Sequence, residues 1–225
     1  MSDGFHFLDI VFFAMVAAFL VLRLRSVLGK RTGHERPPEQ WQGAGAPSRP
    51  NPDNVIDLGR ARRSANEPGP NTPVGMGLSA IRAADPAFDA DAFLGGARQA
   101  FEMIVAAYAA GDKAALQPLL APDVWRHFAE AIDTRRRAGE TLDTELLAMR
   151  QVEFVEARMD GASAVVTLRF VSEQINLLRD ASGTVVEGDP ERVAEVKDEW
   201  TFRRDVRSTD PNWLLVGTRT PADGA

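Results

Sequence analysis

The sequence predicts an α+β domain, with helices packed on one face of an antiparallel sheet, preceded by a single transmembrane helix. An apolar run, Ile10 to Leu22, stands near the N-terminus. Between residues 89 and 137 apolar side chains recur every three or four positions, as in amphipathic helices, whereas from residue 152 to residue 218 they alternate with polar ones. Helices followed by a series of strands favour a helical layer on one face of an antiparallel sheet.

The apolar run indicates a short transmembrane anchor over residues 5–24. These 20 residues can cross a bilayer if Asp9 and Arg23 lie at the two interfaces. Acidic residues at the start, and basic ones where a signal peptide would be cleaved, indicate that the anchor is retained. The positive-inside rule then predicts an outside N-terminus and a cytoplasmic C-terminal domain. The basic residues that set this orientation are Arg23, Arg25, Lys30 and Arg31. A buried core helix is the alternative.

Residues 25–77 are predicted to be a basic linker rich in proline and glycine. From Thr32 to Gly77 large apolar side chains are too few to offset the entropy lost on ordering, and we expect disorder. These 46 residues would reach roughly 35–40 Å as a flexible coil. The linker contains Val55-Ile56-Asp57-Leu58, followed by Arg60, Arg62 and Arg63, which is either a short binding motif or ordinary linker.

The folded part is predicted to begin near Leu78, and its first helix starts beyond residue 89. Asp89 or Asp91 can cap this helix by accepting hydrogen bonds from its free N–H groups. Its apolar face carries Phe93, Ala97, Phe101, Ile104, Val105 and Tyr108 at helical spacing. Gly111 is expected to end it.

Two further helices are predicted before the sheet. Asp112 can cap a short helix that runs through Leu116 to Leu120. Pro122 suits the first turn of a third helix, which is closed by Arg135–Arg137 and Gly139. One face of this third helix carries Val124, Phe128 and Ile132.

The strands are predicted from residue 152 onwards. Val152 and Phe154 begin the first strand, and Asp160-Gly161 is a hairpin signal that leads into a second strand with Ala164, Val166, Leu168 and Phe170. This strand continues to about Leu178, before a turn over residues 180–183. The third strand lies at Val185–Val186 or at Val193–Ala194. The next contains Val196, Trp200 and Phe202, and the last runs from Trp213 to Thr218.

Composition excludes several kinds of site. The formal net charge of −6 argues against binding nucleic acid through its phosphates. The chain has no cysteine, which excludes disulfides, thiolate zinc sites and cysteine nucleophiles. Its histidines, His6, His34 and His127, are far apart in the sequence and do not form a metal-ligand pattern. We therefore expect no metal and no cofactor.

Several motifs resemble the Tim44-like domain family. They are the run from Phe93 to Phe101, Ile104, Gly111-Asp-Lys-Ala-Ala-Leu116, the stretch from Leu119 to Val124, Glu199-Trp-Thr-Phe-Arg-Arg204, and Asp210-Pro-Asn-Trp-Leu-Leu215. The resemblance covers residues 78–220 and leaves a tail at residues 221–225. The N-terminal anchor and polar linker are similar to those of bacterial members of the family.

The resemblance implies a cystatin-like or nuclear-transport-factor-two-like cone, in which a curved sheet wraps helices around an apolar pocket. It also implies a non-enzymatic scaffold at the bacterial inner membrane, which binds lipid and recruits membrane or transport proteins. A related mitochondrial branch docks ribosomes, so a ribosome is an alternative partner. The chain lacks the long charged coiled segment of the eukaryotic members.

The predicted pocket is lined by apolar residues of the helices and the sheet. An aromatic-lined cavity would accept an acyl chain or an apolar peptide side chain. The alternative is that these side chains only fill the core. The candidates are Phe101, Ile104, Val105, Tyr108, Phe128, Phe170, Trp200 and Phe202.

Two other functions are compatible with the sequence: catalysis by a buried acid, and binding of lipid headgroups by basic residues. Asp198 shares strand parity with Trp200 and could act as a buried acid, with Tyr108 as a hydrogen-bond donor and His127 as a base. Anionic lipid headgroups would bind the basic residues behind the anchor, Arg23, Arg25, Lys30, Arg31 and Arg36, and a second basic run lies at Arg135–Arg137.

Overall fold

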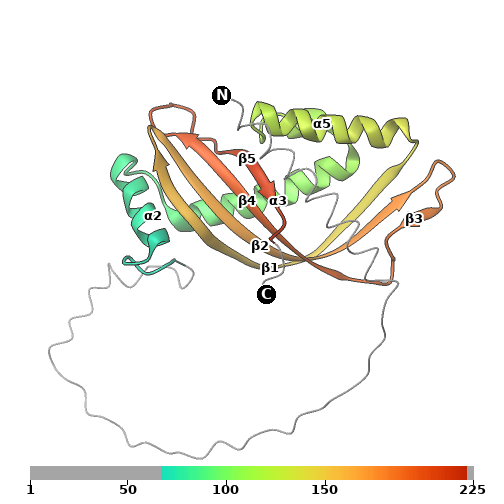
Figure 1. Ribbon diagram of the computed structural model, residues 1–225, viewed down its shortest axis with the longest axis horizontal. Helices are drawn as coiled ribbons and strands as arrows, with labels where there is room; N and C mark the ends of the chain where they lie inside the picture. Colours follow the sequence, from blue (N-terminus) through green and yellow to red (C-terminus); the bar gives the residue numbers. More distant parts are fainter. Residues whose placement is uncertain (1–66, 222–225) are drawn as a thin grey trace, which may run out of the picture.

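The computed structural model describes residues 67–221, which form a helical layer on one face of a curved antiparallel sheet (Figure 1). The predicted α+β architecture is therefore confirmed. The helices are α2 (Pro73–Ala84), α3 (Ala90–Ala110), α4 (Lys113–Leu116) and α5 (Pro122–Arg137). The strands are β1 (Thr141–Asp160), β2 (Ser163–Arg179), β3 (Val185–Glu187), β4 (Ala194–Asp205) and β5 (Leu214–Arg219).

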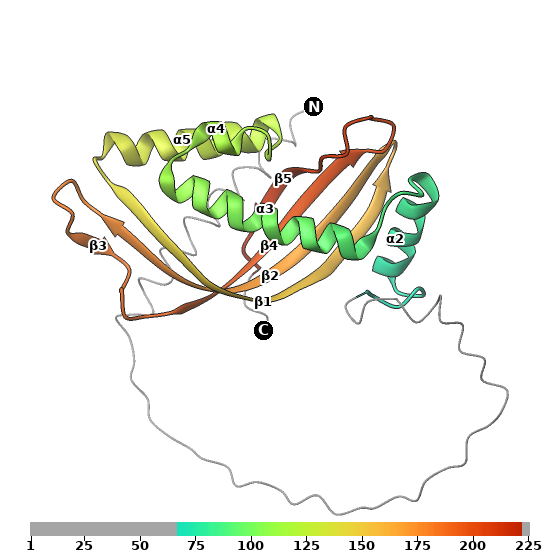
Figure 2. The same ribbon diagram turned by 180° about the vertical axis from the view of Figure 1, so that it is seen from behind.

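The sheet has the order β1-β2-β4-β5, and β3 pairs with the far end of β2. Long β1 and β2 form a bent ribbon, with α3 and α5 on its concave side and α2 near the end opposite β3 (Figure 2). We call the face toward α3 the inner face and the opposite one the outer face. Because β5 pairs only with Glu199–Arg203 of β4, the ribbon extends beyond the rest of the sheet toward β3.

The predicted caps of α3 and α4 are confirmed, although α4 ends at Leu116 and not at Leu120. The Asp89 side chain accepts a hydrogen bond from the backbone N–H of Ala92, and Asp112 caps α4 in the same way. Gly111 ends α3 with a φ of 68°, a left-handed conformation that glycine adopts without a Cβ clash. Gly161 likewise has a φ of 57° in the predicted hairpin between β1 and β2.

Helix α2 corrects the predicted start of the folded part, because it begins at Pro73 rather than near Leu78. Its sequence contains two glycines and one proline, which favour a linker in isolation. The Thr72 side chain caps the helix, and Leu78 and Ile81 are buried in the core. Packing against β1 therefore decides the conformation of this segment.

Strand β1 also differs from the prediction, since it begins at Thr141 rather than at Val152. Irregularities of register occur between Leu146 and Ala148 and between Met149 and Gln151. Each extra residue shifts the side-chain alternation by one, which hides a strand from a pattern search. The third strand is the first of the two predicted alternatives, Val185–Glu187.

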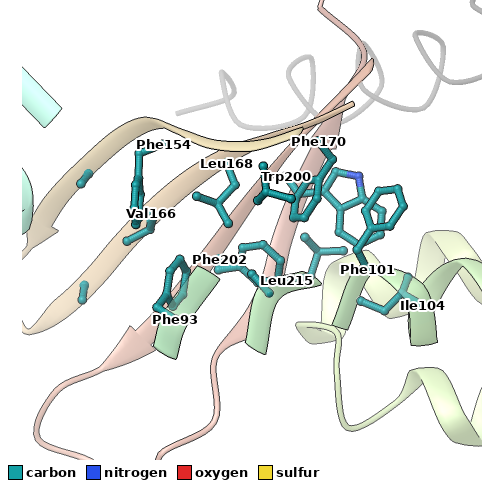
Figure 3. Packing of buried hydrophobic residues seen from close by; sticks show 14 of the residues in the cluster. Phe93, Phe101, Ile104, Phe154, Val166, Leu168, Phe170, Trp200, Phe202 and Leu215 are labelled. Carbon is teal, nitrogen blue, oxygen red and sulfur yellow. The ribbon is translucent and has the colours of Figure 1, made fainter. Parts of the chain in front are cut away.

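The core lies between α3 and the inner face (Figure 3). Phe93 of α3 packs near Phe154 and Phe202, while Phe101 packs between Phe170 and Trp200. The predicted anchor, residues 5–24, and the linker as far as residue 66 lie outside the described residues. None of the helices between residues 67 and 221 has both the length and the apolar character needed to cross a bilayer.

Candidate functional site

The eight predicted pocket residues lie together between α3, α5 and the inner face. The Phe101 ring lies 4.7 Å from that of Phe170 and 4.5 Å from that of Trp200, and Tyr108 lies 5.2 Å from Phe128. Val105 and Tyr108 are half-buried and pack against this cluster. The other six are buried core residues: Phe101, Ile104, Phe128, Phe170, Trp200 and Phe202. Their ring contacts are those of a packed core, so Val105 and Tyr108 are the members nearest to solvent.

A row of polar side chains continues the inner face of β2 beyond Phe170. Ser172 and Gln174 are buried, and Asn176 follows them. Asn176 Nδ2 donates to Gln174 Oε1 at 3.2 Å, and Gln174 Nε2 donates to Ser172 Oγ at 2.8 Å. Since buried polar groups need partners, this chain of bonds lets an amide and a hydroxyl lie among apolar neighbours. Sequence analysis missed the row, although its signal was three polar residues at alternate positions.

Asp198 lies on the same face, opposite Phe170 in the neighbouring strand. Burial raises the pKa of its carboxyl to about 6, and a hydrogen bond with the Thr220 side chain opposes this shift. The pairing of Asp198 with Phe170, a buried residue of the inner face, supports the predicted inward orientation of its side chain. Thr220, rather than Tyr108 or His127, supplies the hydrogen bond to Asp198.

Asp198→Asn is expected to remove a pH dependence of stability. The pKa of Asp198 is higher in the folded state than in the unfolded state, so folding favours the protonated acid. The stability that protonated Asp198 contributes is fully present below about pH 4 and is lost as the pH rises through about 6. Since the side chain is half-buried, we expect the variant to be about 1–2 kcal/mol more stable at pH 7.5 and nearly unchanged at pH 3.5, which is below the unfolded-state pKa. Urea denaturation at both pH values measures this.

Glu195→Gln is the matched control for Asp198→Asn, because Glu195 lies on the same strand with an exposed side chain. It should leave the difference between the two pH values unchanged. Equal stabilities of Asp198→Asn and the unmodified chain at pH 7.5 would contradict a raised pKa of the half-buried carboxyl at position 198.

Tyr108 and the arginines at the end of α5 hold the end of α3. Burial raises the pKa of the Tyr108 hydroxyl, and Arg135, whose guanidinium lies 5.0 Å from the ring centre, opposes this shift. Arg135 Nη2 also donates to the carbonyl oxygens of Tyr108 and Ala109 at 2.7 and 3.0 Å, and Arg136 Nη2 donates to that of Gly111 at 2.8 Å. Two residues of the Arg135–Arg137 run therefore bond to helix-end carbonyls, which favours a structural role over lipid contact.

A second buried acid, which sequence analysis missed, lies on the outer face. Glu199 is only 2% exposed, and its carboxylate accepts hydrogen bonds from Arg169 at 2.8 Å and from Arg219 at 2.6 Å. Burial would raise the pKa of Glu199, but the bonds and charges of the two arginines outweigh it and hold the pKa below its usual range. Arg169 also binds Glu153, so the network joins β1, β2, β4 and β5. Only one feature of the sequence indicates this network: Glu199 precedes Trp200 in a strand, so its side chain lies on the opposite face of the sheet.

Within residues 67–221, His, Asp and Glu side chains form no group of three or more that could hold a metal ion. The basic candidates for lipid headgroups, Arg23, Arg25, Lys30 and Arg31, lie outside the described residues.

A family model described as the Tim44-like domain matches residues 74–220. The chain belongs to the Tim44-like domain family. The match covers the helical layer and the whole sheet. It includes nearly all of α2, whereas the predicted domain start at residue 78 falls in the middle of that helix.

Curated relatives carry the same family name. The chain is 25% identical over 142 residues to mitochondrial import inner membrane translocase subunit TIM44-1 of Arabidopsis thaliana, covering 60% of this chain and 30% of the relative. Human TIM44 is also 25% identical over 142 residues, covering 62% of this chain and 31% of the relative. The chain thus spans about a third of the length of these relatives.

Solved structures resemble the Tim44-like domain less closely. The intermembrane space region of chloroplast protein ARC6 matches with a TM-score of 0.44 at 14% identity, over 61% of this chain and 100% of that one. An NTF2-like superfamily protein from Salmonella enterica matches with a TM-score of 0.38 at 11% identity, over 61% of this chain and 96% of that one.

Proposed function

We propose that this chain is a membrane-tethered, non-enzymatic scaffold at the cytoplasmic face of a bacterial inner membrane, acting in protein transport or membrane-protein biogenesis. The observation that best supports this proposal is a Tim44-like domain at residues 74–220 that follows an apolar run at residues 5–24. Curated relatives are named as inner-membrane translocase subunits, which supports this setting. The partners are membrane or transport proteins, with a ribosome as the alternative.

The ligand of the domain is apolar, an acyl chain or an apolar peptide side chain. Support comes from the half-buried Val105 and Tyr108, where the aromatic cluster of α3 and the sheet meets solvent. The buried row of Ser172 and Gln174 supplies hydrogen-bonding groups on the same inner face. Apolar walls with a few polar groups are typical of ligand sites in proteins.

The basic residues behind the anchor bind anionic lipid headgroups. Each cation near an anionic surface contributes about 1 kcal/mol to membrane attachment. The same charges orient the anchor. These residues are Arg23, Arg25, Lys30 and Arg31.

Photo-crosslinking in intact membranes tests the ligand. A photoreactive residue at Tyr108 is expected to give phospholipid or membrane-protein adducts, identified by mass spectrometry. The same residue at Arg207, which is exposed in the turn after β4, is the control. Adducts at Tyr108 no more frequent than at Arg207 would count against the proposal.

A reporter fused after Ala225 tests topology separately. A reporter that is active only in the cytoplasm should be active, and one that is active only in the periplasm should be silent. Periplasmic activity would overturn the proposed orientation, whatever the ligand.

The alternative function is an enzyme that uses Asp198 as a buried acid or base. One observation favours it: a pKa of about 6 suits proton transfer near neutral pH. Incubating the chain with ketones and enoyl acids in D₂O would reveal proton abstraction as deuterium uptake, which Asp198→Asn should abolish. The scaffold proposal expects no uptake with either protein.

A further inference from the structure

One face of α3 is exposed but carries almost no polar side chains. In Figure 2, α3 runs in front of the sheet, and this face is turned away from the sheet. Exposed helix faces ordinarily carry polar and charged side chains, as α5 does with five charged residues at exposed positions. On α3 only one of six exposed residues along this face is polar. We call these six residues the α3 seam: Ala92, Gly96, Gln99, Met103, Ala106 and Ala110.

The α3 seam contains a large apolar side chain with a hollow beside it. Met103 is 56% exposed and is one of the five large hydrophobic residues that are exposed in the described chain. At Gly95 and Gly96, a Cβ would meet no other atom within 4 Å. Glycine inside a helix costs about 1 kcal/mol relative to alanine, and within residues 67–221 no packing contact offsets this cost.

The spacing of the α3 seam is that of a coiled coil. Side chains spaced alternately four and three positions apart lie along one side of a helix, and each enters a hole between four residues of a second helix. Met103 lies one turn after Gln99, and a hole between small side chains lies one turn before it. This hole is formed by Ala92, Gly95, Gly96 and Gln99. Two antiparallel copies of α3 that cross near Gln99 therefore bring each Met103 opposite the hole of the other copy.

The charges beside the α3 seam fit the same arrangement. Arg98 and Glu102 lie on one flank of the seam, and neither makes an ion pair or a side-chain hydrogen bond within the described residues. In an antiparallel helix pair the same flank of each helix faces the other, so Arg98 of one copy lies near Glu102 of the second. Because the pair is symmetric, this ion pair forms twice. A parallel pair would instead place each charged flank beside the uncharged one.

We propose that α3 is an interface between two copies of this chain, in which the α3 seams pack antiparallel about a twofold axis near Gln99. Such an interface is isologous, since each copy supplies both the projecting Met103 and the hole that receives it. Exposed apolar side chains with a charged rim are typical of interaction surfaces. The inference goes beyond the scaffold role, because a paired domain presents two copies of the inner-face site.

The interface is small. The two helices overlap along residues 92–106, about 22 Å. A single helix pair of this length buries less than a standard interface, which buries about 1,200–2,000 Å². The dimer is therefore weak in dilute solution. Chains that the proposed anchor holds on one membrane meet at a higher effective concentration, which favours pairing.

Disulfide crosslinking tests the interface, because the chain has no cysteine of its own. In the full-length chain, Gln99→Cys is expected to form a covalent dimer under mild oxidation. Small seam residues let the helix axes approach to about 8 Å, and Cα atoms near the twofold axis then come within the about 4.4–6.8 Å that a disulfide needs. Glu130→Cys, at an exposed position of α5, is the matched control. We expect about five-fold more dimer for Gln99→Cys at the same chain concentration, since the contact raises the effective concentration of the two thiols.

Filling the hole separates the proposed contact from random collision. Gly96→Leu should reduce the Gln99→Cys dimer to the level of the Glu130→Cys control, whereas Glu130→Leu in the same background should leave it unchanged. Since a Cβ at Gly96 meets no other atom of the chain within 4 Å, the domain should remain folded, which circular dichroism checks. Equal yields for the two cysteine variants, or a dimer that Gly96→Leu does not reduce, would overturn the interface.

Charge reversal tests the antiparallel arrangement. Arg98→Glu should lower the yield of the Gln99→Cys dimer, because it places like charges opposite each other at both ends of the twofold pair. The double variant Arg98→Glu/Glu102→Arg should restore the yield, since both ion pairs form again with exchanged partners. A double variant that remains as low as Arg98→Glu would contradict the antiparallel arrangement.

Discussion

Phe101→Ala is expected to lower the free energy of unfolding by about 3–5 kcal/mol, the usual cost of removing a fully buried ring. The Phe101 side chain is fully buried, and its ring packs against Phe170 and Trp200 on two different strands. Its removal opens a cavity between α3 and the sheet that these neighbours cannot fill without leaving their own contacts. Domains of this kind have only about 5–15 kcal/mol of stability, so the variant should be marginally folded.

Urea denaturation followed by circular dichroism measures this loss. Met103→Ala is the matched control on the same helix, because Met103 is 56% exposed and should change stability by no more than about 0.5 kcal/mol. Phe101→Leu, which retains part of the volume, should lie between the two. A loss below 1 kcal/mol for Phe101→Ala would show that the ring does not organise the interface between α3 and the sheet.

Gly77→Ala is expected to destabilise the domain by about 1–3 kcal/mol, although alanine is ordinarily the better helix former. A Cβ at Gly77 would overlap the carbonyl oxygen and carbonyl carbon of Ala157, so α2 must move away from β1 to make room for it. This movement would pull Leu78 and Ile81 out of the core.

Gly95→Ala gives the opposite sign and serves as the control. Gly95 also lies in a helix, α3, but a Cβ there meets no other atom within 4 Å. The substitution should therefore stabilise the protein by about 0.5–1 kcal/mol through helix propensity. Thermal unfolding of both variants gives the comparison, and stabilisation by Gly77→Ala would contradict the close approach of α2 to β1.

Local features of the fold were predictable because neighbouring residues determine them. Asp89 and Asp112 cap helices, Gly111 ends one, and Gly161 forms a hairpin turn, as their sequence contexts indicate. Each depends on a side chain or a φ angle within a few residues. The α+β class followed from the change of period between the helices and the strands.

Features that depend on distant contacts were not predictable. The sequence of α2 resembles a linker, and only Leu78 and Ile81 packed in the core explain its helix. Likewise, Glu199 looks like an exposed strand residue until Arg169 and Arg219 approach it from neighbouring strands. Their positions are set by strand order and register, which a single sequence does not reveal.

For the candidate site, helical period places Phe101 on the apolar face of α3, and strand parity places Phe170, Asp198 and Trp200 on the inner face opposite it. The role of each of these residues depends on contacts between segments that are far apart in the sequence. Phe101 and Trp200 pack as core, and the Asp198 carboxyl is buried far enough for its pKa to rise to about 6. The reason is that burial and electrostatics arise from atoms far apart in the chain, whereas periodicity is a local property.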